Sequence, residues 1–91
     1  MRLCPVVEGV EFMVEEQGVR IRALILRDAL EAFFGADDSP SSWLRAYEDH
    51  RDVIDGVAAH RYRSDRTQPL VVLRAEREED FMPTRRQLGR F

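Results

Sequence analysis

The sequence predicts an α+β fold in which an antiparallel β-hairpin is followed by two helices and then by a third strand that joins the sheet (β-β-α-α-β). Two observations support this prediction. Apolar residues alternate along residues 10–14 and 19–25, as expected of strands with one buried face. From Leu26 onward the apolar spacing changes to three and four residues, which is typical of a helix with one apolar face. Sheet and helix are therefore expected to enclose one core.

The hairpin is expected to join residues 10–14 to residues 19–25 through a polar loop of three to five residues around Glu15–Gly18. Arg20 and Arg22 point to water in this interpretation. The second-strand residues that share the buried face are Val19, Ile21, Ala23 and Ile25. Residues 1–7 can pair with the hairpin as an edge strand.

Two helices are predicted after the hairpin. The first covers about residues 27–34 and ends at Gly35, which can adopt the left-handed conformation of a helix stop. The second begins after Ser39, with Pro40 at its first position, and continues to about Arg63. Its apolar face comprises Trp43, Leu44, Tyr47, Ile54, Val57 and Ala58. Gly56 lies within this helix, and we expect another backbone to pack closely against it.

The rest of the chain is expected to add one short strand. Residues 64–69 form a polar turn, and the apolar run 70–73 has the length of a strand that joins the hairpin. Residues 76–80 form a charged turn, after which Phe81 folds back on the core. The domain prediction is one α+β domain over residues 1–81 and a basic, flexible C-terminal tail over residues 82–91.

Composition favours a small protein of the cytoplasm. The chain has 91 residues, and no apolar run approaches the ~20 residues that cross a bilayer. A single cysteine, Cys4, cannot form an internal disulfide, which agrees with a reducing compartment. Residues 1–81 hold eleven arginines against seventeen acids, a net charge of −6, whereas residues 82–91 hold three arginines and no acid, or +3. We therefore expect an acidic body and a basic tail.

The order and spacing of several motifs resemble one bacterial family, domain of unknown function 1488. The motifs are Val10-x-Phe12, Gln17-Gly18-Val19-Arg20-Ile21-x-Ala23-x-Ile25, Asp28-Ala29-Leu30, Phe33-x-Gly35, Tyr47, His50-Arg51-x-x-Ile54 and Asp80-Phe81. The resemblance covers about residues 8–81. It implies a compact α+β fold in a bacterial cytoplasm and no assigned activity. Ala23 and Arg27 stand where the family tends to have Cys and Ser, which weakens the idea of a shared catalytic thiol or hydroxyl.

Enzymatic chemistry and metal binding are not predicted. His50 and His60 lie ten residues apart on the predicted second helix, so they cannot share a metal. Cys4 has no histidine beside it in the sequence that would activate its thiol as a nucleophile. We expect no catalytic residue, no cofactor and no metal, and a small enzyme is kept only as a second alternative.

Protein–protein contact is the leading functional prediction. A short helix at 27–34 cannot place Phe33, Phe34 and Leu30 in one small core without a partner, and interfaces are enriched in aromatic residues and arginine. The candidate partner-binding residues are Phe33, Phe34, Trp43, Tyr47 and Arg51. Because Arg51 interrupts the apolar stripe of the second helix, it should be partly buried in a salt bridge or an interface; alternatively, its stem extends to water. The partner is either a second copy, giving a homodimer, or a protein that this chain assists or regulates.

Nucleic-acid binding is the first alternative. The arginines that could form one basic edge are Arg61, Arg63, Arg66, Arg85, Arg86 and Arg90, joined by Arg74 and Arg77. Tyr62 could stack on a base. The same arginines at the end of the second helix also complement its dipole, so their presence has a structural explanation.

Overall fold

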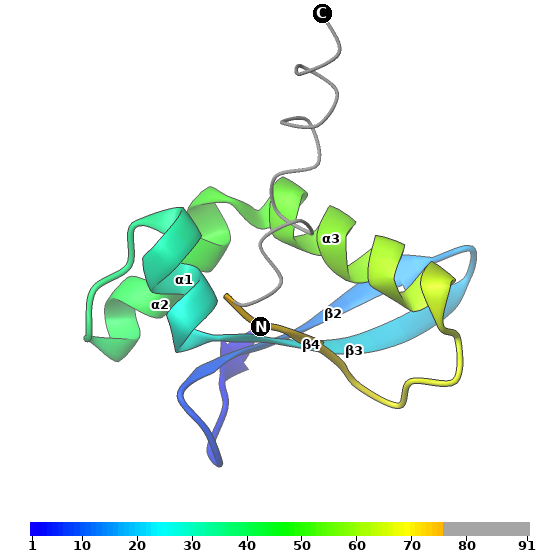
Figure 1. Ribbon diagram of the computed structural model, residues 1–91, viewed down its shortest axis with the longest axis horizontal. Coiled ribbons are helices and arrows are strands. Elements are labelled where there is room, and N and C mark those ends of the chain that lie inside the picture. The colour runs from blue at the N-terminus through cyan, green and yellow to red at the C-terminus, as the bar shows by residue number, and fades with distance from the viewer. Residues whose placement is uncertain (76–91) are drawn as a thin grey trace, which may run out of the picture.

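Four strands form one sheet, and three helices lie across one of its faces (Figure 1). The computed structural model describes residues 1–75. The elements in chain order are β1 (Arg2–Leu3), β2 (Gly9–Glu16), β3 (Val19–Leu26), α1 (Arg27–Phe34), α2 (Pro40–Asp49), α3 (Arg51–Ser64) and β4 (Val71–Leu73). The strands lie in the order β1-β2-β3-β4; β2 is antiparallel to both β1 and β3, and β4 is parallel to β3. The predicted α+β class, with its hairpin, helices and final strand, is confirmed.

The β2–β3 hairpin closes through two residues. Gln17 and Gly18 have φ values of 52° and 80°, and Glu16 is already paired with Val19. Positive φ at both central residues is the conformation of a type I′ turn, which matches the twist of the strands that it joins. The predicted loop of three to five residues is therefore too long, because Glu15 and Glu16 belong to the ladder.

The alternation in β3 divides its residues between two environments. Ile21, Ala23 and Ile25 are buried in the core, and Arg20 and Arg22 are exposed, as predicted. The prediction for Val19 is wrong. Its exposed fraction is 45%, because it lies at the end of the strand beside the turn.

The edge strands flank this hairpin. Arg2 and Leu3 pair with Glu11 and Val10, so the predicted edge strand near the N-terminus is confirmed. At the opposite edge, β4 lies next to β3 with Ala23 opposite Val71. Parallel pairing requires a long connection. The three helices provide that connection between β3 and β4.

Local capping fixes the helix ends. Helix α1 follows β3 directly, and its end is set by Gly35, whose φ is 73° and whose N–H donates to the carbonyl of Leu30. The side chain of Ser39 accepts a hydrogen bond from the N–H of Ser42 at the start of α2, and Pro40 occupies the first helical position. Both predicted helix starts and the glycine stop are confirmed.

The predicted second helix is interrupted at His50, so the prediction of one continuous helix is wrong. His50 has φ −121° and ψ 23°, and it ends α2 and precedes α3. Helix α2 packs on α1 and on β2, whereas α3 packs on β2 and β4. The break lets one apolar stripe face two different parts of the fold.

Gly56 lies in α3 without a close neighbour. A Cβ atom added there would meet nothing within 4 Å, and the residue is exposed. The expectation of close backbone packing at Gly56 is therefore wrong. A different glycine, Gly9 at the start of β2, is the tightly packed one, since an added Cβ would lie 2.5 Å from the carbonyl oxygen of Ile25.

One core joins the sheet to all three helices. Its buried members are Val10, Phe12, Ile21, Ala23, Ile25, Ala29, Leu30, Trp43, Ala46, Tyr47, Ile54, Val57, Ala58, Val71 and Leu73. The rings of Phe12 on β2 and Tyr47 on α2 lie 4.8 Å apart between centroids. The hydrophobic effect of this burial holds the helices on the sheet.

Several predictions concern residues outside 1–75. These are the charged turn at 76–80, the packing of Phe81, the Asp80-Phe81 motif and the tail at 82–91. Within the part that the structure describes, none of the helices has the length and apolar character needed to cross a membrane.

Candidate protein-interaction surface

The sheet has a second face, on the side opposite the helices (Figure 1). Val10 and Phe12 of β2 point into the core, as do Ile21 and Ala23 of β3, so the alternate residues of both strands point the other way. We call this surface the open sheet face. Its strand residues are Arg2, Glu11, Met13, Glu15, Arg20, Arg22, Leu24 and Val72. Consistent with this division, Glu16 lies on the helix side, where its carboxylate is 2.7 Å from Arg63 of α3.

Cross-strand register sets the neighbours on the open sheet face. Glu15 is opposite Arg20, Met13 is opposite Arg22, and Glu11 is opposite Leu24. Such directly opposed side chains interact. The carboxylates therefore follow β2 and the guanidinium groups follow β3, with Met13 between the two glutamates.

An ion pair lies at one end of this surface. The Nε of Arg2 is 3.3 Å from a carboxylate oxygen of Glu11. Leu24 lies next to Glu11 in the register and has an exposed fraction of only 7%, although it is not part of the core between sheet and helices. The open sheet face is thus partly apolar at its centre and charged around it.

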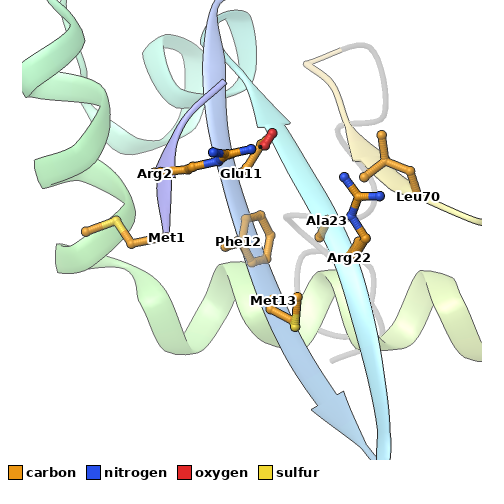
Figure 2. A pocket seen from close by; sticks show the side chains of 8 residues that line it. All are labelled: Met1, Arg2, Glu11, Phe12, Met13, Arg22, Ala23 and Leu70. Atoms are coloured by element: carbon orange, nitrogen blue, oxygen red, sulfur yellow. Dashed lines mark hydrogen bonds and ion pairs between the residues drawn. The ribbon is translucent and has the colours of Figure 1, made fainter. Parts of the chain in front are cut away.

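A shallow pocket of about 270 Å³ opens on this face (Figure 2). Its lining residues are Met1, Arg2, Glu11, Phe12, Met13, Arg22, Ala23 and Leu70. The lining has one carboxylate, already paired with Arg2, and neither a histidine nor a cysteine. Two methionines and a leucine beside arginine stems suit contact with an apolar protein side chain.

The predicted aromatic contact residues separate into two groups. Trp43 and Tyr47 are buried in the core, and the indole N–H of Trp43 donates a 2.8 Å hydrogen bond to the carbonyl of Asp37. Phe33 and Phe34 are half-buried and pack against the core. The ring of Phe34 lies 4.9 Å from that of His50. Trp43 and Tyr47 therefore stabilise the fold, and they are not accessible to a partner in this arrangement.

Arg51 lies on the surface of α3, so the expectation that it is partly buried is wrong. Its side chain is 62% exposed and its Nε lies 3.6 Å from Asp55, one helical turn later. The alternative in which its stem extends to water describes it correctly, because the break at His50 turns this position outward. The guanidinium also lies over the ring of Tyr47, 6.0 Å from the centroid.

The hydroxyl of Tyr47 makes the other contact to Asp55. It donates a 2.7 Å hydrogen bond to the carboxylate. Burial of the phenol and the negative charge of Asp55 both disfavour the phenolate, so they raise the pKa of Tyr47 above its usual value. This hydrogen bond joins α2 to α3 across the break at His50.

This raised pKa predicts a loss of stability in alkali. Below about pH 10 the phenol is protonated in both the folded and the unfolded chain. As the pH rises further, the unfolded chain releases this proton before the folded chain does, so the free energy of unfolding falls. The free energy of unfolding of the Tyr47→Phe variant is expected to be about 1 kcal/mol lower than that of the wild type at pH 8. Between pH 9 and 11 it should depend less on pH than that of the wild type. Urea unfolding of both proteins across this range checks it, and a constant difference between them would contradict the prediction.

Two arginines of the predicted basic edge make contacts within the chain. A guanidinium N–H of Arg61 donates to the carbonyl of Val72 in β4, and Arg63 pairs with Glu16. Arg66 is exposed in the turn after α3. Arg77, Arg85, Arg86 and Arg90 lie outside the described residues. Within residues 1–75, the side chains of Arg61 and Arg63 are therefore already occupied by contacts within the chain.

The remaining candidates do not form a chemical site. His50 and His60 are exposed, Cys4 is half-exposed, and none of the three lines the pocket. Among residues 1–75 there is no group of three or more His, Cys, Asp or Glu side chains placed to hold a metal.

Sequence reasoning did not identify the open sheet face. Arg20 and Arg22 were predicted to point to water, and alternation with Val10 and Phe12 puts Glu11 and Met13 on the same side. One signal was present: Met13 interrupts a polar alternation between Glu11 and Glu15. A large apolar residue at a position predicted to face water could have marked this surface as a contact site.

Comparison with known proteins gives a family but no described activity. A family model named "Protein of unknown function (DUF1488)" matches residues 2–73. The matched segment begins with β1 and ends with β4, so it includes every helix and strand described above. No curated protein and no solved structure matches the chain.

Proposed function

We propose that this chain, which belongs to the family of proteins of unknown function DUF1488, acts through protein–protein contacts made by its open sheet face. The proposed role is non-enzymatic: self-association, or assistance to or regulation of a partner protein. A bacterial cytoplasm is the proposed location, from the composition and the single cysteine.

One observation carries this proposal: the open sheet face has a half-exposed methionine at its centre. Met13 has an exposed fraction of 50% and is directly opposite Arg22. Leu70 and Met1 contribute further exposed apolar surface to the same pocket. Methionine and arginine are both enriched in protein interfaces, and a partner covering this face would remove the apolar atoms from water.

The charge pattern favours a protein partner over nucleic acid. A surface that follows a phosphate backbone needs an excess of positive charge. On the open sheet face Arg2 pairs with Glu11, and Arg20 lies opposite Glu15. Alternating signs of this kind suit another protein surface with its own mixture of charges.

The experiment compares two substitutions at equally exposed positions. Met13 on the open sheet face and Val53 on α3 both have exposed fractions of 50%. The tagged full chain and its Met13→Glu and Val53→Glu variants are used to capture proteins, including untagged copies of this chain, from a lysate of the source cells. Mass spectrometry then quantifies each captured protein, and circular dichroism verifies that both variants are folded.

The expected result is a protein retained by the wild type and by Val53→Glu but reduced at least about tenfold with Met13→Glu, because a carboxylate would be buried against the partner. Equal recovery with both variants would contradict the assignment of the open sheet face. Loss of capture only with Val53→Glu would move the contact surface to the helices.

A further inference from the structure

We infer that the occupant of the open sheet face is a second copy of this chain, packed face to face about a two-fold axis. The axis runs parallel to the strands and passes between β2 and β3. The inference rests on the proposed function and names the partner of that same surface.

The charge arrangement on the two central strands is the first step. Along β2 the open sheet face presents Glu11, Met13 and Glu15, and the directly opposed residues of β3 are Leu24, Arg22 and Arg20. An acidic strand therefore lies beside a basic one. Near the hairpin turn, Glu15 and Arg20 form the last oppositely charged pair of this face, and both are exposed.

Two-fold symmetry makes this arrangement self-complementary. Rotation about the stated axis exchanges the positions of β2 and β3 but leaves each residue at the same height along the strands. Glu15 of one copy then faces the partner's Arg20, and Arg20 faces the partner's Glu15. Met13 of each copy faces the apolar stem of the partner's Arg22.

The alternative in-plane axis, perpendicular to the strands, is disfavoured by the same charges. It would place β2 of one copy over β2 of the other and bring Glu15 toward the partner's Glu11. Like charges in direct opposition weaken an interface. The pattern on β2 and β3 therefore favours the axis parallel to the strands, which also aligns the strands of the two sheets as in a β-sandwich.

Apolar residues provide the area that this contact removes from water. Met13 and Leu70, exposed at 50% and 36%, supply most of this area, whereas Leu24, beside Val72 in the register, is only 7% exposed. Because charged residues surround them, we expect a reversible dimer whose population depends on protein concentration. Sedimentation velocity of the full chain from about 10 μM to about 1 mM should show a mass rising from 10.6 kDa toward twice that value.

Charge exchange tests the geometry. Arg20→Glu and Glu15→Arg each replace the two attractive contacts between copies by two repulsive ones, so each should raise the dissociation constant by about tenfold or more. The variant with both exchanges restores opposite charges, and it should dimerise as the wild type does.

An equimolar mixture of the two single variants is the decisive sample. Within each chain the residues at positions 15 and 20 still carry like charges, so the cross-strand pair is not repaired. Between the chains both contacts regain opposite charges. The mixture should therefore form a heterodimer at concentrations where each variant alone is monomeric. Thermal unfolding of each single variant establishes that it is folded.

Two outcomes would overturn the inference. One is a wild-type chain that remains monomeric at about 1 mM; the other is a dimer that neither single exchange weakens. A monomeric wild type that still captures another protein in a Met13-dependent manner would contradict self-association and leave the proposed function standing. If the wild type is monomeric and also captures no protein in a Met13-dependent manner, both self-association and the proposed function are contradicted.

Discussion

The Leu30→Ala variant is expected to lose about 2–5 kcal/mol of its free energy of unfolding, a large share of what a domain of this size has. Leu30 is fully buried, with an exposed fraction of 0%, where α1 meets the core. Truncation removes apolar contacts and leaves a cavity that the short helix cannot fill without moving. Urea unfolding followed by circular dichroism measures the change.

The matched control is Leu70→Ala, the same substitution at a position with an exposed fraction of 36% on the open sheet face. It should change the free energy of unfolding by less than about 1 kcal/mol, because little apolar area is lost from the fold. Equal losses from the two substitutions would show that α1 does not cover the core as described.

The Gly9→Ala variant is expected to be destabilised by about 1–3 kcal/mol, since a single methyl group would have to displace backbone. An added Cβ at Gly9 would lie 2.5 Å from the carbonyl oxygen of Ile25 and 3.2 Å from the Cα of Leu26. Both atoms belong to the β3 backbone that pairs with β2 at this point. Thermal and urea unfolding should both report the loss.

Gly56→Ala is the control for this substitution, and it should have the opposite sign. The added methyl group would meet no atom within 4 Å, and alanine favours a helix over glycine by up to about 1 kcal/mol. Destabilisation by both alanine substitutions, to a similar extent, would mean that the close approach at Gly9 does not decide the effect.

The regular elements were predictable because their signals are local. The two-residue alternation in β3, the αL conformation at Gly35 and the cap at Ser39 each depend on a few neighbouring residues. The length of the hairpin loop was not predicted, because Glu15 and Glu16 are polar yet remain paired with Arg20 and Val19. Polarity alone cannot distinguish a loop from the solvent side of a strand.

The division of the second helix at His50 was not predictable from the apolar stripe. The spacing from Trp43 to Ala58 fits one helix equally well, but in the structure the first half packs on α1 and β2 and the second half on β2 and β4. The same break explains why Arg51 is exposed, although it lies in the gap of that stripe.

The candidate contact surface was also not predictable from the local sequence pattern. Aromatic residues near arginine were predicted to bind a partner, but Trp43 and Tyr47 of α2 are buried in the core, where the indole N–H and the phenol each have a hydrogen-bond partner. The open sheet face instead combines residues from four strands, including Arg2 and Val72, which are far apart in the sequence.

The sequence by itself determined the α+β class, the order of the main elements and many residues of the core, because periodicity and capping act over a few residues. The tertiary structure alone decided where the second helix divides and which charges lie side by side. These features depend on how segments distant in sequence pack together to bury apolar surface, and no local pattern specifies that packing.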